Sequence, residues 1–154
     1  MKNYIVVTGG AGFIGSNLID YFISNTNKKI LSIDNYSCGF KKNHILSKRI
    51  KYIKADTKNI NKVLSKYKNQ INSLFHFGEF SRIFQSFNKF DECFQSNSIG
   101  TQATFKFCLD NKIKLIYSAT SASLGRNGKD KELSPYAFTK SKNLELLNNL
   151  KKWF

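Results

Sequence analysis

The stretch Thr8–Gly15, "TGGAGFIG", decides the fold of this 154-residue chain. It follows a short β-branched run, Tyr4–Thr8, that is typical of a buried strand. It precedes apolar residues at helical spacing in Phe13–Ser24. Three of its glycines, Gly9, Gly12 and Gly15, have a G-x-x-G-x-x-G spacing. Between a strand and a helix, this spacing permits a tight turn, close approach of backbone to a pyrophosphate and close helix–sheet packing. The stretch therefore predicts a dinucleotide-binding turn rather than a generic glycine-rich connection.

The rest of the chain alternates strand-like and helix-like segments. Further strands are expected at Lys29–Asp34, Ile50–Asp56, Ile71–Phe77 and Ile113–Ala119. Helices are expected at Ile60–Tyr67, over most of Ser86–Asp110, and at Pro135–Trp153. This alternation favours βαβ units with right-handed crossovers. The predicted fold class is α/β, a Rossmann-type doubly wound parallel sheet with helices on both faces, formed by residues 1–154 as one domain.

The composition is that of a globular chain with an excess of lysine. Apolar residues make up 41% and charged residues 23%, and no apolar run approaches the ~20 residues of a membrane span. We therefore expect a cytoplasmic protein with no membrane partner. The net charge is +15, yet the only arginines are Arg49, Arg82 and Arg126. Arginine suits bidentate phosphate and base contacts, so we interpret the charge as compositional bias and expect no nucleic-acid partner. A nucleic-acid binder that exploits this charge remains a rival hypothesis.

The cysteines give no sign of a disulfide framework. Cys38, Cys93 and Cys108 are odd in number and form no CxxC pair. Reduced thiols are expected, and no metal site is predicted. Cys108, within "FKFCLD", is interpreted as a small core residue.

Two acidic residues end the second and third expected strands. Asp34 lies nineteen residues after Gly15, where a carboxylate would accept hydrogen bonds from an adenosine ribose and repel a 2′-phosphate. This favours NAD over NADP, although the nearby Lys41 and Lys42 keep NADP as an alternative. Asp56 is placed either to reach the adenine or to cap the following helix.

Seven pieces of the sequence, in order, resemble the extended short-chain dehydrogenase/reductase family, in its NAD-dependent nucleotide-sugar epimerase/dehydratase branch. They are "TGGAGFIGSNL", "SIDNYS", "KAD", "LFHFGE", "NSIGT", "YSATSASLG" and "SPYAFTK". They cover nearly all of the chain but only the N-terminal half of such an enzyme. The resemblance implies an incomplete NAD-binding domain, truncated before the substrate domain. It also implies a nucleotide-sugar substrate, a UDP-hexose, in the full-length enzyme, and it leaves a homodimer open.

The resemblance assigns the cofactor contacts residue by residue. The implied set is Gly9, Gly12, Phe13, Ile14, Gly15, Asp34, Asn35, Asp56, Thr57, Phe77, Gly78, Glu79, Asn97, Tyr136 and Lys140. Asp34 and Asn35 would bind the adenosine ribose and its surroundings, and Asp56 and Thr57 would flank the adenine. The residues after the fourth strand would form a wall, and Asn97 would support the central helix and the active site.

Three residues at or just after the fourth expected strand affect the predicted shape of the site. Glu79 departs from the small residue usual in the family, and Ser81 falls where some epimerases carry a lysine. Because of these two departures, the resemblance does not define the shape of the pocket on the nicotinamide side. His76 is expected to be structural rather than a catalytic base.

The stretch Ser134–Lys140, "SPYAFTK", carries the predicted reactive pair. Tyr136 and Lys140 are four residues apart and share one helix face. A phenol ionises near pKa 10, so a base near neutral pH needs about 4 kcal/mol of preferential phenolate stabilisation. An adjacent ammonium and a positive nicotinamide ring are natural sources. The same stretch also predicts a capped helix start, with Ser134 as the cap and Pro135 first in the helix.

The resemblance adds Thr120 as the third catalytic residue, with Ser118 and Ser121 as neighbouring alternatives. Dehydratases of this family follow the threonine with an Asp–Glu pair, but Ser121 and Ala122 stand here. We therefore expect epimerisation of the UDP-glucose 4-epimerase type, through a 4-keto intermediate and hydride transfer to and from NAD. Dehydration, reduction and a non-catalytic NAD-binding module are the alternatives. The 154-residue chain alone is expected to be inactive.

Overall fold

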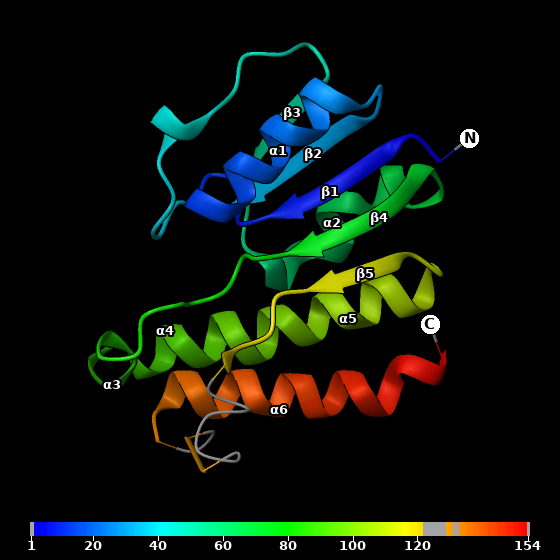
Figure 1. Ribbon diagram of the computed structural model, residues 1–154. Helices are drawn as coiled ribbons and strands as arrows, with labels where there is room; N and C mark the ends of the chain where they lie inside the picture. The colour runs from blue at the N-terminus through cyan, green and yellow to red at the C-terminus, as the bar shows by residue number, and fades with distance from the viewer. Residues whose placement is uncertain (1, 122–128, 131–132, 154) are drawn as a thin grey trace.

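The computed structural model describes residues 2–121, 129–130 and 133–153, and these form a five-stranded parallel sheet (Figure 1). The strands are β1 (Tyr4–Thr8), β2 (Lys29–Asp34), β3 (Ile50–Lys54), β4 (Ile71–His76) and β5 (Lys114–Tyr117). Their spatial order is β3-β2-β1-β4-β5. The predicted α/β fold with a doubly wound parallel sheet is confirmed.

The helices lie in the predicted segments, but α2 (Ile60–Leu64) ends three residues earlier than expected and continues as the 3-10 helix Ser65–Gln70, and one further region is more broken than expected. The other helices are α1 (Phe13–Asn25), α3 (Gln85–Asn88), α4 (Phe90–Phe94), α5 (Thr101–Asp110) and α6 (Pro135–Leu150). A helix over most of Ser86–Asp110 was expected, but the backbone breaks at Lys89, with φ −116° and ψ 48°. A π-helical segment, Gln95–Gly100, then joins α4 to α5. None of the helices in the described part is long and apolar enough to cross a bilayer.

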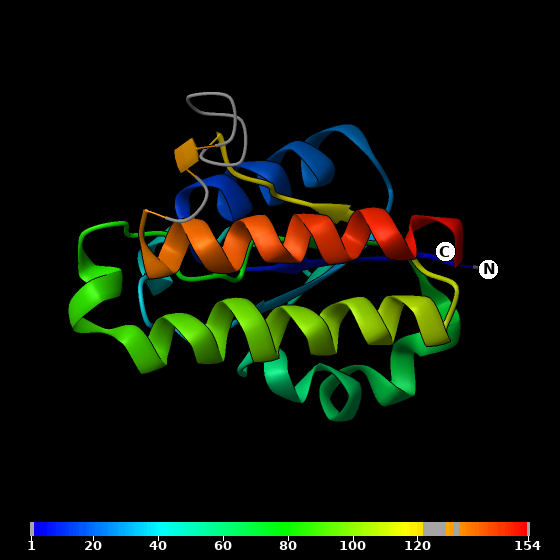
Figure 2. The same cartoon turned by 90° about the horizontal axis from the view of Figure 1, so that it is seen from below.

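Each face of the sheet has its own apolar core. On one face, Ile5, Val7 and Ile30 pack against Ile19 of α1. On the other face, residues of the sheet pack with those of α2 and α5, including Val6, Leu31, Ile33, Ile60, Leu64, Leu74, Phe107 and Cys108. Figure 2 shows α1 on the opposite side of the sheet from α2 and α5, with α6 beside α5. The expected helices on both faces and the expected core position of Cys108 are therefore confirmed.

The glycine turn is held in contact with the end of β4. Gly9 has φ +70°, and a Cβ there would lie 2.8 Å from the backbone of Phe77 and Gly78. A Cβ on Gly15 would lie only 2.2 Å from the carbonyl oxygen of Gly9. The first glycine thus permits both the turn geometry and the approach of β4, and the third lets α1 start directly against the turn.

The order of the strands fixes where a ligand can bind. From β1 the chain passes through α1 to β2 on one side, whereas β4 pairs with the other edge of β1. The point where the strand order reverses direction is called the switch point. In an open parallel sheet, ligands usually bind in the crevice at the carboxyl ends of the two strands on either side of it. Here that point lies between β1 and β4.

Replacing Gly15 by alanine tests the close approach in the turn. We expect Gly15→Ala to lower the free energy of unfolding by about 1–3 kcal/mol, because the new methyl overlaps backbone that cannot move away. Gly12→Ala is the matched control, since its Cβ would meet the same Gly9 oxygen at the milder distance of 3.2 Å. Urea denaturation of both variants measures the difference. Equal losses in the two variants would contradict this account of the turn.

Candidate functional site

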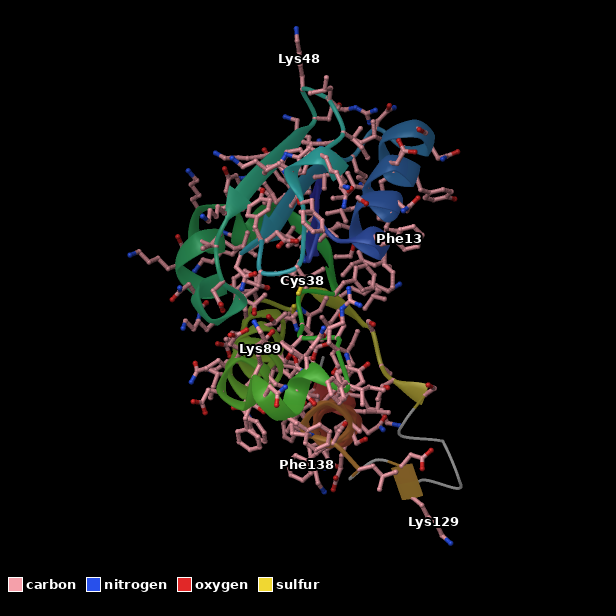
Figure 3. The ribbon with its side chains drawn as sticks, turned by 90° about the vertical axis from the view of Figure 1, so that its left-hand side faces the viewer. Phe13, Cys38, Lys48, Lys89, Lys129 and Phe138 are labelled. Atoms are coloured by element: carbon pink, nitrogen blue, oxygen red, sulfur yellow. The ribbon has the colours of Figure 1, made fainter. Side chains whose placement is uncertain are left out.

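A cavity of about 420 Å³ lies at the carboxyl edge of the sheet. It is lined by Gly9, Gly12, Phe13, Ile14, Gly15, Ile33, Asp34, Asn35, Ser37, Cys38, Gly39, Phe40, Asn43, Ala55, Thr57, Phe77, Gly78, Glu79, Phe80, Ser81, Arg82, Ser96, Ser118, Tyr136 and Lys140. Figure 3 looks onto this edge, with Phe13 of α1 and Cys38 of the loop after β2 labelled. Most of the residues predicted from the sequence to bind the cofactor thus line one cavity.

Asp34 organises the end of the cavity nearest β2. Its Oδ2 accepts a hydrogen bond from the backbone N–H of Ala11 at 2.9 Å, and its Oδ1 accepts one from Tyr36 at 2.8 Å. Tyr36 has φ +63°, a left-handed conformation that this second bond stabilises. Asp34 as a whole residue is 9% exposed and lines the cavity. Asp34 therefore joins the glycine turn to β2 and also presents an acceptor to a ligand.

The loop after β2 closes over the glycine turn, a contact that was not predicted from the sequence. The backbone carbonyl of Ala11 accepts hydrogen bonds from the Phe40 N–H at 3.1 Å and from Asn43 Nδ2 at 2.8 Å. A Cβ on Gly39 would lie 2.9 Å from the Ala11 Cβ, so only glycine fits there without a shift. In the sequence, Gly39 was the one residue that could have indicated this close contact. Lys41 and Lys42, which had kept NADP as an alternative, are exposed and do not line the cavity.

Asp56 and Asn97, both assigned to the cofactor, do not line the cavity. Asp56 caps the short 3-10 helix Thr57–Asn59, and its Oδ1 accepts a hydrogen bond from the Lys58 N–H at 3.0 Å. Of the two roles considered for Asp56, the structure shows the cap. Thr57, beside it, does line the cavity.

The buried Asn97 side chain braces one wall of the cavity. Its Oδ1 accepts from the Phe80 N–H at 2.6 Å, and its Nδ2 donates to the Phe80 carbonyl at 3.0 Å. Nδ2 also lies 3.2 Å from Thr139 Oγ1 on α6. This placement matches the supporting role expected for Asn97 rather than a direct contact with a ligand.

Helix α6 carries Tyr136 to the cavity. Ser134 caps the helix, because its Oγ accepts a hydrogen bond from the Ala137 N–H at 3.0 Å, and Pro135 takes the first position. The predicted capped start is confirmed. Tyr136 Oη lies 3.5 Å from Thr120 Oγ1 and donates to it. The structure thus brings the predicted tyrosine and threonine together at the end of the cavity away from Asp34.

Lys140 has a partner that the sequence did not reveal. Its buried ammonium donates hydrogen bonds to the Glu79 carboxylate and to the Ser118 carbonyl. It also lies 4.3 Å from the centre of the Tyr117 ring. Lys140 lines the cavity together with Tyr136, but its charge is compensated by Glu79. The only signal in the sequence was that Glu79 replaces the small residue usual in the family.

Glu79 accepts several further hydrogen bonds in the interior. Its Oε1 accepts from Thr101 Oγ1 at 2.9 Å, from Tyr117 Oη at 3.0 Å and from Asn143 Nδ2 at 3.2 Å. Burial, and then the Glu79 charge, hold the pKa of Tyr117 far above its usual value, so this phenol remains a donor. A buried carboxylate is tolerated only when it is paired and hydrogen-bonded, and here both conditions are met.

His76 continues the same network toward the glycine turn. Its Nε2 lies 2.9 Å from Thr101 Oγ1, and its Nδ1 lies 2.7 Å from Thr8 Oγ1. Because a carboxylate can only accept, Thr101 donates to Glu79 and therefore accepts from Nε2–H, which leaves Nδ1 to accept from Thr8. Burial is the main reason that the pKa of His76 falls from 6.5 to about 4; the Glu79 charge opposes this shift and the Lys140 charge adds to it. This neutral, fully buried ring is consistent with the predicted structural role.

These features define a class of protein. The profile of the NAD dependent epimerase/dehydratase family matches residues 5–152, and the chain belongs to this family. It is 34% identical over 161 residues to the ADP-L-glycero-D-manno-heptose-6-epimerase of Brachyspira hyodysenteriae, a match that covers 96% of this chain and 49% of that protein.

Solved structures of epimerases share the fold. A UDP-N-acetylglucosamine 4-epimerase from Methanobrevibacter ruminantium is 30% identical with a TM-score of 0.82, over 99% of this chain and 52% of that one. A UDP-glucose 4-epimerase from Thermotoga maritima is 24% identical with a TM-score of 0.82, over 97% of this chain and 52% of that one. The chain spans about half the length of the curated relatives it matches.

The depressed pKa of His76 predicts acid-sensitive stability. The unfolded chain takes up this proton near pH 6.5, whereas the folded chain resists it until about pH 4. The unfolded state therefore binds more protons between these values, and stability falls as the pH falls, by up to about 3 kcal/mol from this group.

Denaturant unfolding of the wild type and His76→Gln across this pH range measures the effect. The variant is expected to be less stable at neutral pH, because it loses the paired ring, but to show a shallower loss on acidification. Parallel stability curves for the two proteins would show that His76 does not resist protonation.

Proposed function

We propose that this chain is the NAD-binding part of a nucleotide-sugar epimerase of the UDP-glucose 4-epimerase type. The observation that carries the proposal is the arrangement of one cavity. Asp34 lies at one end, and Tyr136, with Thr120 within hydrogen-bond reach, lies at the other beside Lys140. Asp34, which can accept hydrogen bonds from a ribose, and Tyr136, which can transfer a proton, therefore line the same cavity.

The residues present fit a dinucleotide on structural grounds. Helix α1 begins at the cavity with Gly12 as its N-cap, and among the described residues no side chain caps the free N–H groups of its first turn. Such a helix start favours a pyrophosphate. The Asp34 carboxylate and Thr57 line the region expected for the adenosine, whereas Ser118, Tyr136 and Lys140 line the other end.

The reactive residues have distinct roles in this proposal. When bound, NAD would accept a hydride from the carbinol carbon of the substrate and return it to the opposite face of the 4-keto sugar. In its ionised form Tyr136 would take the proton of the substrate hydroxyl. Thr120, whose Oγ1 lies 3.5 Å from Tyr136 Oη, would then donate a hydrogen bond to the phenolate. Lys140 is held in a fixed position next to Tyr136 by its ion pair with Glu79.

Epimerisation is favoured over dehydration because a carboxylic acid pair is lacking after Thr120, where Ser121 and Ala122 stand. Ala122 lies outside the described residues. The named relatives are epimerases of both ADP- and UDP-sugars. A UDP-hexose is the proposed substrate. Titration of a longer polypeptide that carries the substrate-binding half with UDP-glucose and with an ADP-sugar distinguishes the two nucleotides.

Asp34 is expected to decide the choice of cofactor. In the wild-type chain, calorimetric titration should show NAD binding more tightly than NADP. Asp34→Asn should lower this preference by about tenfold or more, because it removes the charge that repels a 2′-phosphate. The readout is the ratio of the two dissociation constants, because a general loosening of the turn would weaken NAD and NADP binding equally and leave this ratio unchanged. Asp20→Asn, on the exposed side of α1, is the control for charge and should leave the ratio unchanged. Absence of NAD binding by the wild type would contradict the proposed function.

The Tyr136 hydroxyl is expected to act in the chemical step, and its loss is expected to weaken cofactor binding only slightly. In a longer polypeptide that adds a substrate-binding half after residue 154, Tyr136→Phe should lower kcat by at least about 100-fold. Its affinity for NAD should change by less than about twofold, because the ring is kept. The 154-residue chain should bind NAD without steady turnover. Full activity of the phenylalanine variant would remove the tyrosine from the mechanism.

A further inference from the structure

A buried ion pair crosses the catalytic end of the cavity. Glu79 lies just after β4 and Lys140 on α6, 61 residues later, yet their side chains are joined and each is only 4% exposed. Both residues line the cavity, together with Ser118 and Tyr136. Fixed charge of both signs therefore lies at the place where the proposed chemistry needs the nicotinamide.

The two charges cancel where solvent cannot screen them. Among the described residues, the other charged side chains of the cavity lining are Asp34, at the far end, and the exposed Arg82. Charges in water are weakened by screening, whereas a buried charge acts strongly on its neighbours. A lone Lys140 ammonium would thus impose a positive potential on this end of the cavity, and the Glu79 carboxylate removes it.

We infer that Glu79 is a positioning residue that fixes Lys140 and, by cancelling its charge, balances the affinity of the site for oxidised and reduced cofactor. This inference rests on the proposed function. The nicotinamide ring is a cation in NAD⁺ and is neutral in NADH. An uncompensated positive charge beside it would disfavour NAD⁺ alone, and a site that must pass hydride in both directions benefits from holding both forms.

The test measures the dissociation constants of NAD⁺ and NADH for the full 154-residue chain and three variants. Glu79→Gln leaves the ammonium uncompensated, so the ratio Kd(NAD⁺)/Kd(NADH) should rise about tenfold. Lys140→Met leaves the carboxylate uncompensated, so the ratio should fall by a similar factor. The double variant Glu79→Gln/Lys140→Met removes both charges and should return the ratio to within about threefold of the wild type.

A purely structural brace would not give this pattern. Loss of packing or of hydrogen bonds would weaken both forms together and leave the ratio constant, and that result would overturn the inference. Glu92→Gln, whose exposed carboxylate pairs with Lys89 on the surface, changes the net charge by the same amount and should not move the ratio. If Glu79→Gln does not fold, the fall expected for Lys140→Met and its reversal in the double variant decide the matter.

The two levels of the proposal fail in different ways. A wild-type chain that binds neither NAD⁺ nor NADH would overturn the proposed function and this inference with it. A wild-type chain that binds both, with a ratio unaffected by the charge variants, would overturn this inference and leave the proposed function standing.

Discussion

The buried ion pair between Glu79 and Lys140 is the interaction on which the site depends. Burial of either charge alone would cost several kcal/mol, so the chain must hold both partners in place. Glu79 in turn binds Thr101, Tyr117 and Asn143, which lie on α5, β5 and α6. One carboxylate therefore ties together the elements that form the catalytic end of the cavity.

The strands were predictable because their patterns are local. The bounds of β1 and β2 match the expected ones, since each is an apolar run that ends at a turn or an acidic residue. β4 ends one residue earlier than expected, at His76. Beyond His76, the backbone N–H groups of Phe77 and Gly78 donate hydrogen bonds to the side-chain Oγ1 of Thr8, which is not a backbone strand contact. The break at Lys89 and the π-helical segment after α4 have no local signature that we can identify.

Most residues of the candidate site, and the pairing of Tyr136 with Thr120, were predictable from the sequence, but the pairing of Lys140 with Glu79 was not. The glycine turn, Asp34, Tyr136 and Lys140 all reach one cavity, because parallel strands bring their carboxyl ends to the same edge. The pairing of Lys140 with Glu79 joins residues far apart in the chain and follows no periodicity. The closure of the loop at Gly39 over Ala11 likewise depends on tertiary contacts.

A crystal structure of the chain with NAD would test the central claim most directly. We predict that the dinucleotide runs through the cavity from Asp34 to Tyr136, with the Lys140 ammonium still bonded to Glu79. A dinucleotide bound elsewhere, or a Lys140 side chain released from Glu79 when the cofactor binds, would contradict it.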